Sequence, residues 1–269
     1  TMGMTSKVKP YKFEFGPFTP GIHRMLFPYC YRCPYGQERE SCDLFCAKQF
    51  ESYFLEEVAP SDVAAIVLEP LQGEGGFVLP PDEYIGVLRR ICDEHGILLI
   101  ADEIQTSFGR TGKLFATEHW PAAPDMWTTA KSIAGGLPIS TVTGRAEIME
   151  AAHVGGIGGT YSGNPVAAAA ALKVIEIMQR DDYPARAEKL GTLFCGKLDA
   201  MKEKYPVIGD VRGRGIMLAI ELVKDRSTKE PAKEETNAII QECWQNGLVL
   251  LSAGARGNVI RFLVPLVIT

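Results

Sequence analysis

The sequence contains a short apolar run that ends in an acidic residue, Ile97-Leu-Leu-Ile-Ala-Asp102, and continues as Glu-Ile-Gln105. A run of this length is typical of a buried strand. A similar run, Ala64-Ala-Ile-Val-Leu-Glu69-Pro70, precedes it, and between them Pro81 to His95 has the start signals and apolar spacing of a helix. We therefore predict a strand–helix–strand unit, whose two strands are parallel because a helix connects them.

Polar residues stand where the predicted strands end. Glu69 follows the first strand and Asp102 the second, and parallel strands place their carboxyl ends at one edge of the sheet, where open α/β sheets bind ligands. A third segment, Asp125 to Lys131, brings Lys131 to the same edge. A lysine beside an aspartate in such a crevice suits pyridoxal phosphate chemistry, in which the amine carries the cofactor as a Schiff base and the carboxylate pairs with the pyridine nitrogen. Taken singly, each residue is more simply a solvated lysine or a helix-capping acid.

The remaining pattern extends the α/β alternation. The predicted elements are a strand over 138–144, a polar glycine-rich loop over 155–165, helices over 165–180 and 184–204, and then shorter strands around a helix over 233–246. We predict an α/β fold with a mainly parallel large domain over 1–178 and a smaller C-terminal α/β domain over 179–269.

Composition favours an ordinary globular protein. The chain has 269 residues, 46% of them hydrophobic and 23% charged, with a net charge of −5. The negative balance and the lack of a basic run argue against nucleic acid as a partner, and no apolar stretch approaches the ~20 residues that span a bilayer. The polar start shows no export signal, so we expect a cytoplasmic protein with reduced thiols.

Four of the seven cysteines cluster, as Cys30, Cys33, Cys42 and Cys46. Two close pairs of thiols could bind zinc or an iron–sulfur centre, but their spacing fits the common zinc patterns poorly. We favour a structural interpretation, in which Cys46 is a small buried hydrophobe on a helix over 43–57.

Other motif-based functions receive little support. The run that ends in Asp102 also fits the metal-binding strand of a nucleotide hydrolase, but the sequence holds no phosphate loop of the form G-x-x-x-x-G-K-[ST]. The glycines at 155–159 do not match the dinucleotide fingerprint, and there is no G-x-S-x-G nucleophile motif. The four histidines show no metal-ligand spacing.

Several stretches together resemble the class III (ω-amino acid) aminotransferases of pyridoxal phosphate fold type I. They follow the family's order and spacing and are Val67-Leu-Glu-Pro-Leu-Gln-Gly-Glu-Gly-Gly76, Leu99-Ile-Ala-Asp-Glu-Ile-Gln105, Phe108-Gly-Arg-Thr-Gly112, Thr129-Ala-Lys-Ser-Ile-Ala-Gly-Gly136 and Gly159-Thr-Tyr-Ser-Gly-Asn-Pro165. The resemblance covers essentially the whole chain. It implies ping-pong transfer of an amino group from an ω-amino acid, such as 4-aminobutyrate, to a 2-oxo acid, with pyridoxal 5′-phosphate as cofactor.

The resemblance also implies roles for cofactor-binding residues. Lys131 is similar to the Schiff-base lysine, which also carries the proton, and Asp102 to the partner of the pyridine nitrogen. Gln105 matches a residue that bonds the cofactor's phenolic oxygen, and Ile104 one that packs on a ring face. Thr160 matches a residue that reaches the cofactor phosphate of the neighbouring subunit, which implies a homodimer with shared active sites.

Substrate-binding roles follow in the same way. Arg261 matches an arginine that binds a substrate carboxylate, a contact that suits a planar guanidinium. Glu74 matches a glutamate that pairs with this arginine when the substrate has no α-carboxylate, although a plain surface pair is the alternative. Glu69 is expected nearby as a further polar wall.

The resemblance further predicts that the chain is an internal fragment of a longer enzyme. Family members carry, before the counterpart of Thr1, a small-residue loop that grips the phosphate and an aromatic that stacks on the ring. The segment Val264 to Thr269 stops where the middle of a small domain is expected. Two other functions stay open at this point: amino-acid racemisation or epimerisation through the same Lys131, and a catalytically silent fragment.

Overall fold

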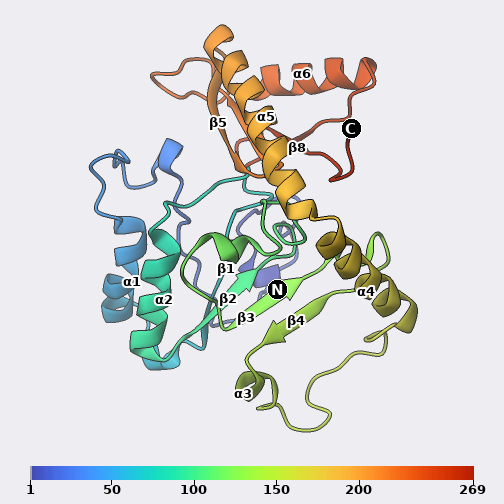
Figure 1. Ribbon diagram of the computed structural model, residues 1–269. Helices are drawn as coiled ribbons and strands as arrows, with labels where there is room; N and C mark the ends of the chain where they lie inside the picture. Colours follow the sequence, from blue (N-terminus) through green and yellow to red (C-terminus); the bar gives the residue numbers. More distant parts are fainter. Residues whose placement is uncertain (1) are drawn as a thin grey trace.

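Two four-stranded sheets form the framework of the computed structural model, which describes residues 2–269 (Figure 1). The first sheet consists, in spatial order, of β1 (Ala65–Leu68), β2 (Leu98–Asp102), β3 (Met126–Thr129) and β4 (Thr141–Gly144). The strands β1, β2 and β3 are parallel, whereas β4 is antiparallel to β3. The predicted strand–helix–strand unit with parallel strands is confirmed.

Two helices, α1 (Phe45–Glu56) and α2 (Tyr84–His95), cover one face of the first sheet. Figure 1 shows them side by side next to β1. The side chains of Leu88 and Ile91 on α2 and of Leu99 on β2 belong to one buried cluster, which is the core of this half. Helix α2 starts three residues later than predicted, because Pro81–Glu83 form a turn before it. Its end at Gly96 agrees with the prediction, since the glycine takes a left-handed φ of +67°.

The other face of the first sheet is only partly covered. Successive strand residues point to opposite faces, so that Leu99 is buried while Val67 and Val142 are 42% and 53% exposed. The short helix α3 (Ala146–Met149) follows β4, and a glycine-rich loop then leads to α4 (Pro165–Arg180). Asn164 caps α4 by accepting hydrogen bonds from the first-turn amides.

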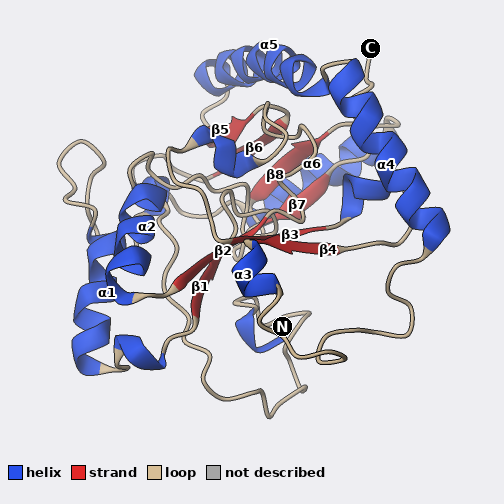
Figure 2. Ribbon diagram, turned by 60° about the horizontal axis from the view of Figure 1, so that its bottom comes forward, coloured by secondary structure: helices blue, strands red, loops and turns tan. Residues whose placement is uncertain are grey.

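A long helix, α5 (Tyr183–Lys204), leads into the second sheet. In the turned view of Figure 2, α4 and α5 follow one another on the side away from α1 and α2. Asp182, with a φ of +47°, separates the two helices. The predicted domain boundary at 178/179 falls in the last turn of α4 and stays a prediction.

The second sheet is antiparallel throughout, in the order β5-β6-β8-β7. Its strands are β5 (Ile208–Arg214), β6 (Met217–Leu222), β7 (Leu251–Ala253) and β8 (Val259–Leu263), and α6 (Lys233–Gln245) packs against it. The alternation of strands and helices agrees with the prediction, and a tight turn at Gly215-Ile216 makes β5 and β6 a hairpin. Within residues 2–269, no helix has the length and apolar character needed to span a membrane.

Candidate active site

The carboxyl ends of the parallel strands bring polar residues into one row. The register pairs Leu68 with Ala101 and Asp102 with Thr128, so Glu69, directly after Leu68, lies beside Asp102. Residues paired in this way point to the same face of a sheet. We call Glu69, Asp102 and Thr128 the polar row. It lies at the edge of the sheet where a ligand crevice was predicted.

Lys131 lies next to this row, two residues after β3. It is the first residue of a short 3-10 helix (Lys131–Ala134), and its φ of +51° is in the left-handed region. Such backbone is unfavourable for a residue with a Cβ and is concentrated at functional sites. Its side chain is exposed among the described residues. The charge of Lys131 acts on Glu69, which places the amine near the polar row.

The carboxyl of Glu69 is largely buried and lies near the charges of Asp102 and Lys131. Burial raises the pKa of its carboxyl, and the negative charge of Asp102 acts in the same direction. The amide of Gly73, which donates to Glu69 Oε2 at 2.8 Å, and the charge of Lys131 oppose this rise. Glu69 therefore ties the glycine-rich loop that follows β1 to the polar row.

The segment after β2 turns sharply over the end of the sheet. The backbone amide of Ile104 donates to Asp102 Oδ1 at 3.1 Å, which orients the carboxylate. The side chain of Gln105 lies directly against Gly73, where a Cβ would come within 1.9 Å of Gln105 Oε1. Glycine at position 73 thus leaves the space that Gln105 occupies.

Two buried oxygen atoms at the crevice suit a polar ligand. Across residues 2–269, Gln105 Oε1 and Thr128 Oγ1 are among the few buried side-chain atoms without a hydrogen-bond partner. Leaving such atoms unpaired costs free energy, and a ligand that bonds them recovers it. An amide and a hydroxyl beside Asp102 and Lys131 offer the donors and acceptors that the ring of pyridoxal phosphate requires. The residues present therefore fit the ring end of that cofactor.

Thr160 is not brought to the crevice by this chain. It lies exposed on the loop that precedes α4. An exposed position is compatible with the predicted contact to a neighbouring subunit, and that contact stays a prediction.

Glu74 and Arg261 form an ion pair across 187 positions of sequence. Arg261 Nη1 on β8 lies 2.5 Å from Glu74 Oε1, so the pair joins the loop after β1 to the second sheet. Burial alone would raise the pKa of Glu74, but the hydrogen bond and charge of Arg261 outweigh it and lower that pKa. The pairing that the sequence suggested is present, whereas its role toward substrates stays a prediction.

The four clustered cysteines line one cavity, together with Arg39. All are free thiols, and among residues 2–269 no group of three or more potential ligands is placed to hold a metal ion. Cys46 is buried on α1 within the core of the first half, as the structural interpretation predicts. Burial raises its pKa to about 11, so this thiol stays protonated and unreactive at neutral pH.

Two buried acids that hold the crevice in place were not singled out from the sequence. Glu103 is fully buried and accepts hydrogen bonds from Thr106, Ala116 and Thr117. Asp125 accepts from the amide of Leu99 at 2.7 Å and is paired with arginine side chains. The only signal for Glu103 was its position next to Asp102, which puts it on the opposite face of the strand.

Comparison with known proteins identifies the family. The family model described as "Aminotransferase class-III" matches residues 1–269. This chain belongs to the class III aminotransferases. It is 50% identical over its whole length to a probable 4-aminobutyrate aminotransferase of Bacillus subtilis (strain 168), of which it covers 62%. It is 49% identical, over 92% of its length, to a leucine/methionine racemase of Thermococcus litoralis, of which it covers 55%.

Solved structures of transaminases share the fold. An amine transaminase from an uncultivated Pseudomonas species, in its PLP-bound form, matches the whole chain with a TM-score of 0.92 at 34% identity, and the chain covers 62% of it. The predicted fold type I architecture is confirmed. The chain spans about three fifths of the length of these relatives.

Proposed function

We propose that the protein catalyses pyridoxal phosphate-dependent transfer of an amino group from an ω-amino acid, of the 4-aminobutyrate kind, to a 2-oxo acid. The observation that carries this proposal is that the charges of Asp102, Lys131 and Glu74 all act on the carboxyl of Glu69, while Glu74 is paired with Arg261. The 4-aminobutyrate aminotransferase relative, at 50% identity, supports the choice of substrate class.

The crevice residues have distinct tasks toward the cofactor. When bound, pyridoxal phosphate supplies a carbonyl for amines and a protonated ring that withdraws electrons from the substrate carbon. Asp102, oriented by the amide of Ile104, would hold the ring nitrogen in its protonated form. Gln105 and Thr128 would bond the polar substituents of the ring, and Ile104 would pack on a ring face.

Lys131 is the residue proposed to bear the cofactor and to move the proton. Its side chain is exposed and its charge acts on Glu69, so the amine would be accessible to both cofactor and substrate. The amine of Lys131 would also take up the substrate proton and return it, and the left-handed turn fixes the backbone from which this side chain extends.

Arg261 and Glu74 are proposed to accommodate both substrates in turn. An ω-amino acid brings no α-carboxylate, and Glu74 then keeps Arg261 neutralised. A 2-oxo acid brings its own carboxylate next to the keto group, which suits the guanidinium of Arg261 once Glu74 has moved away. We further propose a homodimer, in which Thr160 contacts the cofactor phosphate of the partner subunit.

Replacement of Lys131 tests the assignment. The full-length protein would be loaded with pyridoxal 5′-phosphate and assayed with 4-aminobutyrate and 2-oxoglutarate. We expect Lys131→Ala to abolish turnover and the absorbance of lysine-bound cofactor, while Lys113→Ala, which changes an exposed lysine, retains both. Turnover by Lys131→Ala at the wild-type rate would sink the assignment.

Racemisation is the second candidate, since the leucine/methionine racemase relative is 49% identical. Incubation with one enantiomer of leucine or methionine, without an oxo acid, distinguishes the two reactions. Loss of optical purity in this assay, together with no transfer from 4-aminobutyrate, would favour the racemase.

A further inference from the structure

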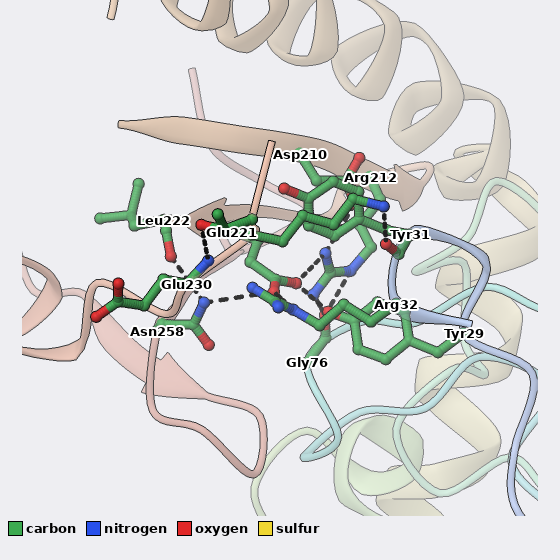
Figure 3. A network of polar contacts seen from close by, with 12 residues as sticks. Tyr29, Tyr31, Arg32, Gly76, Asp210, Arg212, Glu221, Leu222, Glu230 and Asn258 are labelled. Carbon is green, nitrogen blue, oxygen red and sulfur yellow. Dashed lines mark hydrogen bonds and ion pairs between the residues drawn. The ribbon is translucent and has the colours of Figure 1, made fainter. Parts of the chain in front are cut away.

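A largely buried network of charged groups joins Glu221 and Arg212 to the backbone of Gly76, two residues after Glu74 (Figure 3). Its centre is Glu221 on β6, whose side chain is 1% exposed. Glu221 accepts hydrogen bonds from Tyr29 and Arg32 of the N-terminal segment and from Asn258 beside β8, and Arg212 Nη1 lies 2.7 Å from it. The network thus joins segments that are far apart in the sequence.

Arg212 connects this network to the Gly73–Gly76 loop, which follows β1. Its Nη1 also lies 2.8 Å from Asp210 Oδ2, while Nε and Nη2 both donate to the carbonyl oxygen of Gly76, at 3.0 and 2.8 Å. The guanidinium is 9% exposed and has all three nitrogen atoms engaged. Because the planar guanidinium of Arg212 is held by two carboxylates, the direction in which it donates to the Gly76 carbonyl oxygen is fixed.

The gripped carbonyl belongs to the loop that carries Glu74. Gly73 donates to Glu69 at one end, Gly254 N donates to the Glu74 carbonyl at 3.0 Å, and Arg212 holds Gly76 at the other end. Gly76 has a φ of +114°, a conformation that side chains rarely adopt, and a Cβ there would lie 3.2 Å from Arg212 Nη2. The backbone on both sides of Glu74 is therefore fixed, although its side chain is 44% exposed.

We propose that Arg212 is a positioning residue that sets substrate selectivity by holding the Gly73–Gly76 loop so that Glu74 reaches Arg261. The inference rests on the proposed function. With its nitrogen atoms engaged and its surface buried, Arg212 acts on substrates only through Glu74. A loosened loop leaves Arg261 with an uncompensated charge, which penalises a substrate that lacks an α-carboxylate and spares one that brings it.

The effect should divide the two half-reactions. Loss of two charge-assisted hydrogen bonds to Gly76 should lower kcat/KM for 4-aminobutyrate ~10-fold. The half-reaction with 2-oxoglutarate, which requires Glu74 to leave Arg261, should change by less than ~2-fold. A merely structural role would lower both half-reactions together.

The test compares Arg212→Met and Arg212→Lys with Arg214→Met in the full-length protein loaded with pyridoxal 5′-phosphate. Arg214 is two positions along the same strand. Within residues 2–269 its one ion-pair partner is the exposed Asp82, at 3.5 Å, and its guanidinium lies over the Trp120 ring, so it controls for loss of an arginine from this strand. Arg212→Lys keeps the positive charge beside Glu221, so it serves as the second variant should Arg212→Met fail to fold. It still lacks the planar guanidinium that donates two hydrogen bonds to the Gly76 carbonyl. Hydrogen exchange of a peptide over residues 70–79 gives a readout that is independent of turnover.

The expected result is faster exchange of this peptide and a selective loss of 4-aminobutyrate turnover in both Arg212 variants, with neither change in Arg214→Met. Unaltered exchange, or an equal fall in both half-reactions, would overturn the inference while leaving the proposed function intact. Absence of amino transfer from 4-aminobutyrate in the wild-type protein would instead refute the proposed function, and the selectivity role with it.

Discussion

Replacing Glu103 by glutamine should destabilise the protein far more than loss of one charge at its surface. Glu103 Oε1 accepts from the amide and hydroxyl of Thr117, at 2.8 and 3.0 Å, and Oε2 accepts from Thr106 and from the amide of Ala116. Each oxygen thus faces one backbone N–H. In either orientation, the glutamine NH2 group opposes one of these N–H groups, whereas the hydroxyls can rotate and accept.

The expected loss in the free energy of unfolding follows from one buried N–H group that is left without an acceptor. A buried N–H without an acceptor costs ~1–3 kcal/mol, and the surviving contacts lose the strength that a charge gives them, so we expect a loss of ~2–4 kcal/mol in the free energy of unfolding. Urea unfolding of wild type, Glu103→Gln and the control Glu94→Gln measures this loss. Glu94 is a suitable control because it is exposed and, among residues 2–269, forms only a long ion pair with Arg90 at 3.6 Å. A difference between the two variants below ~0.5 kcal/mol would refute the hydrogen-bond accounting.

Two further predictions concern the glycine-rich loop. Arg261 lowers the pKa of Glu74 from its usual 4.5, so their pair stabilises the folded state above pH 4.5 and loses this contribution as the pH falls through the lowered pKa. The free energy of unfolding of Glu74→Gln should therefore be ~0.5–1 kcal/mol below that of wild type at pH 7 and equal to it in strong acid. A difference in the free energy of unfolding that persists in strong acid would contradict this. Gly73→Ala should displace Gln105, since its Cβ would lie 1.9 Å from Gln105 Oε1, and weaken cofactor binding in a fluorescence titration. The control Gly86→Ala lies on α2 with no atom within 4 Å of the added Cβ, so it should bind the cofactor normally and gain ~0.5–1 kcal/mol of stability. Equal cofactor affinities of Gly73→Ala and Gly86→Ala would argue against a role for Gln105 in cofactor binding.

The first half of the fold could be predicted from local sequence. The apolar runs that end at Glu69 and Asp102 specify buried strands, the helix between them forces these strands to be parallel, and parallel strands bring both acids to one edge. The position of Lys131 followed from the same argument. What the sequence did not indicate is the left-handed backbone at Lys131, because no glycine marks that turn.

The second half and its links were less accessible. Short apolar segments after α5 predicted strands, but their direction depends on a hairpin turn and on pairing of β6 with the distant β8. Arg212 grips Gly76 across 136 positions, and Glu221 binds Arg32 across 189. Such contacts are set by tertiary packing, so the residues look like ordinary surface charges in the sequence.

Under the proposed function, the chemistry and the choice of substrate depend on different parts of the fold. Asp102 ends β2 and Lys131 follows β3, so their arrangement depends on the strand register of the first sheet and on buried acids such as Glu103. The Glu74–Arg261 pair instead bridges the first sheet's loop to the second sheet. A change in the bridge can therefore alter which carboxylate is accepted while the lysine and the aspartate stay in place. Two relatives at 50% and 49% identity carry names for different reactions, so overall similarity does not decide between them. We propose that the intact Glu74–Arg261 pair favours amino transfer from a substrate without an α-carboxylate.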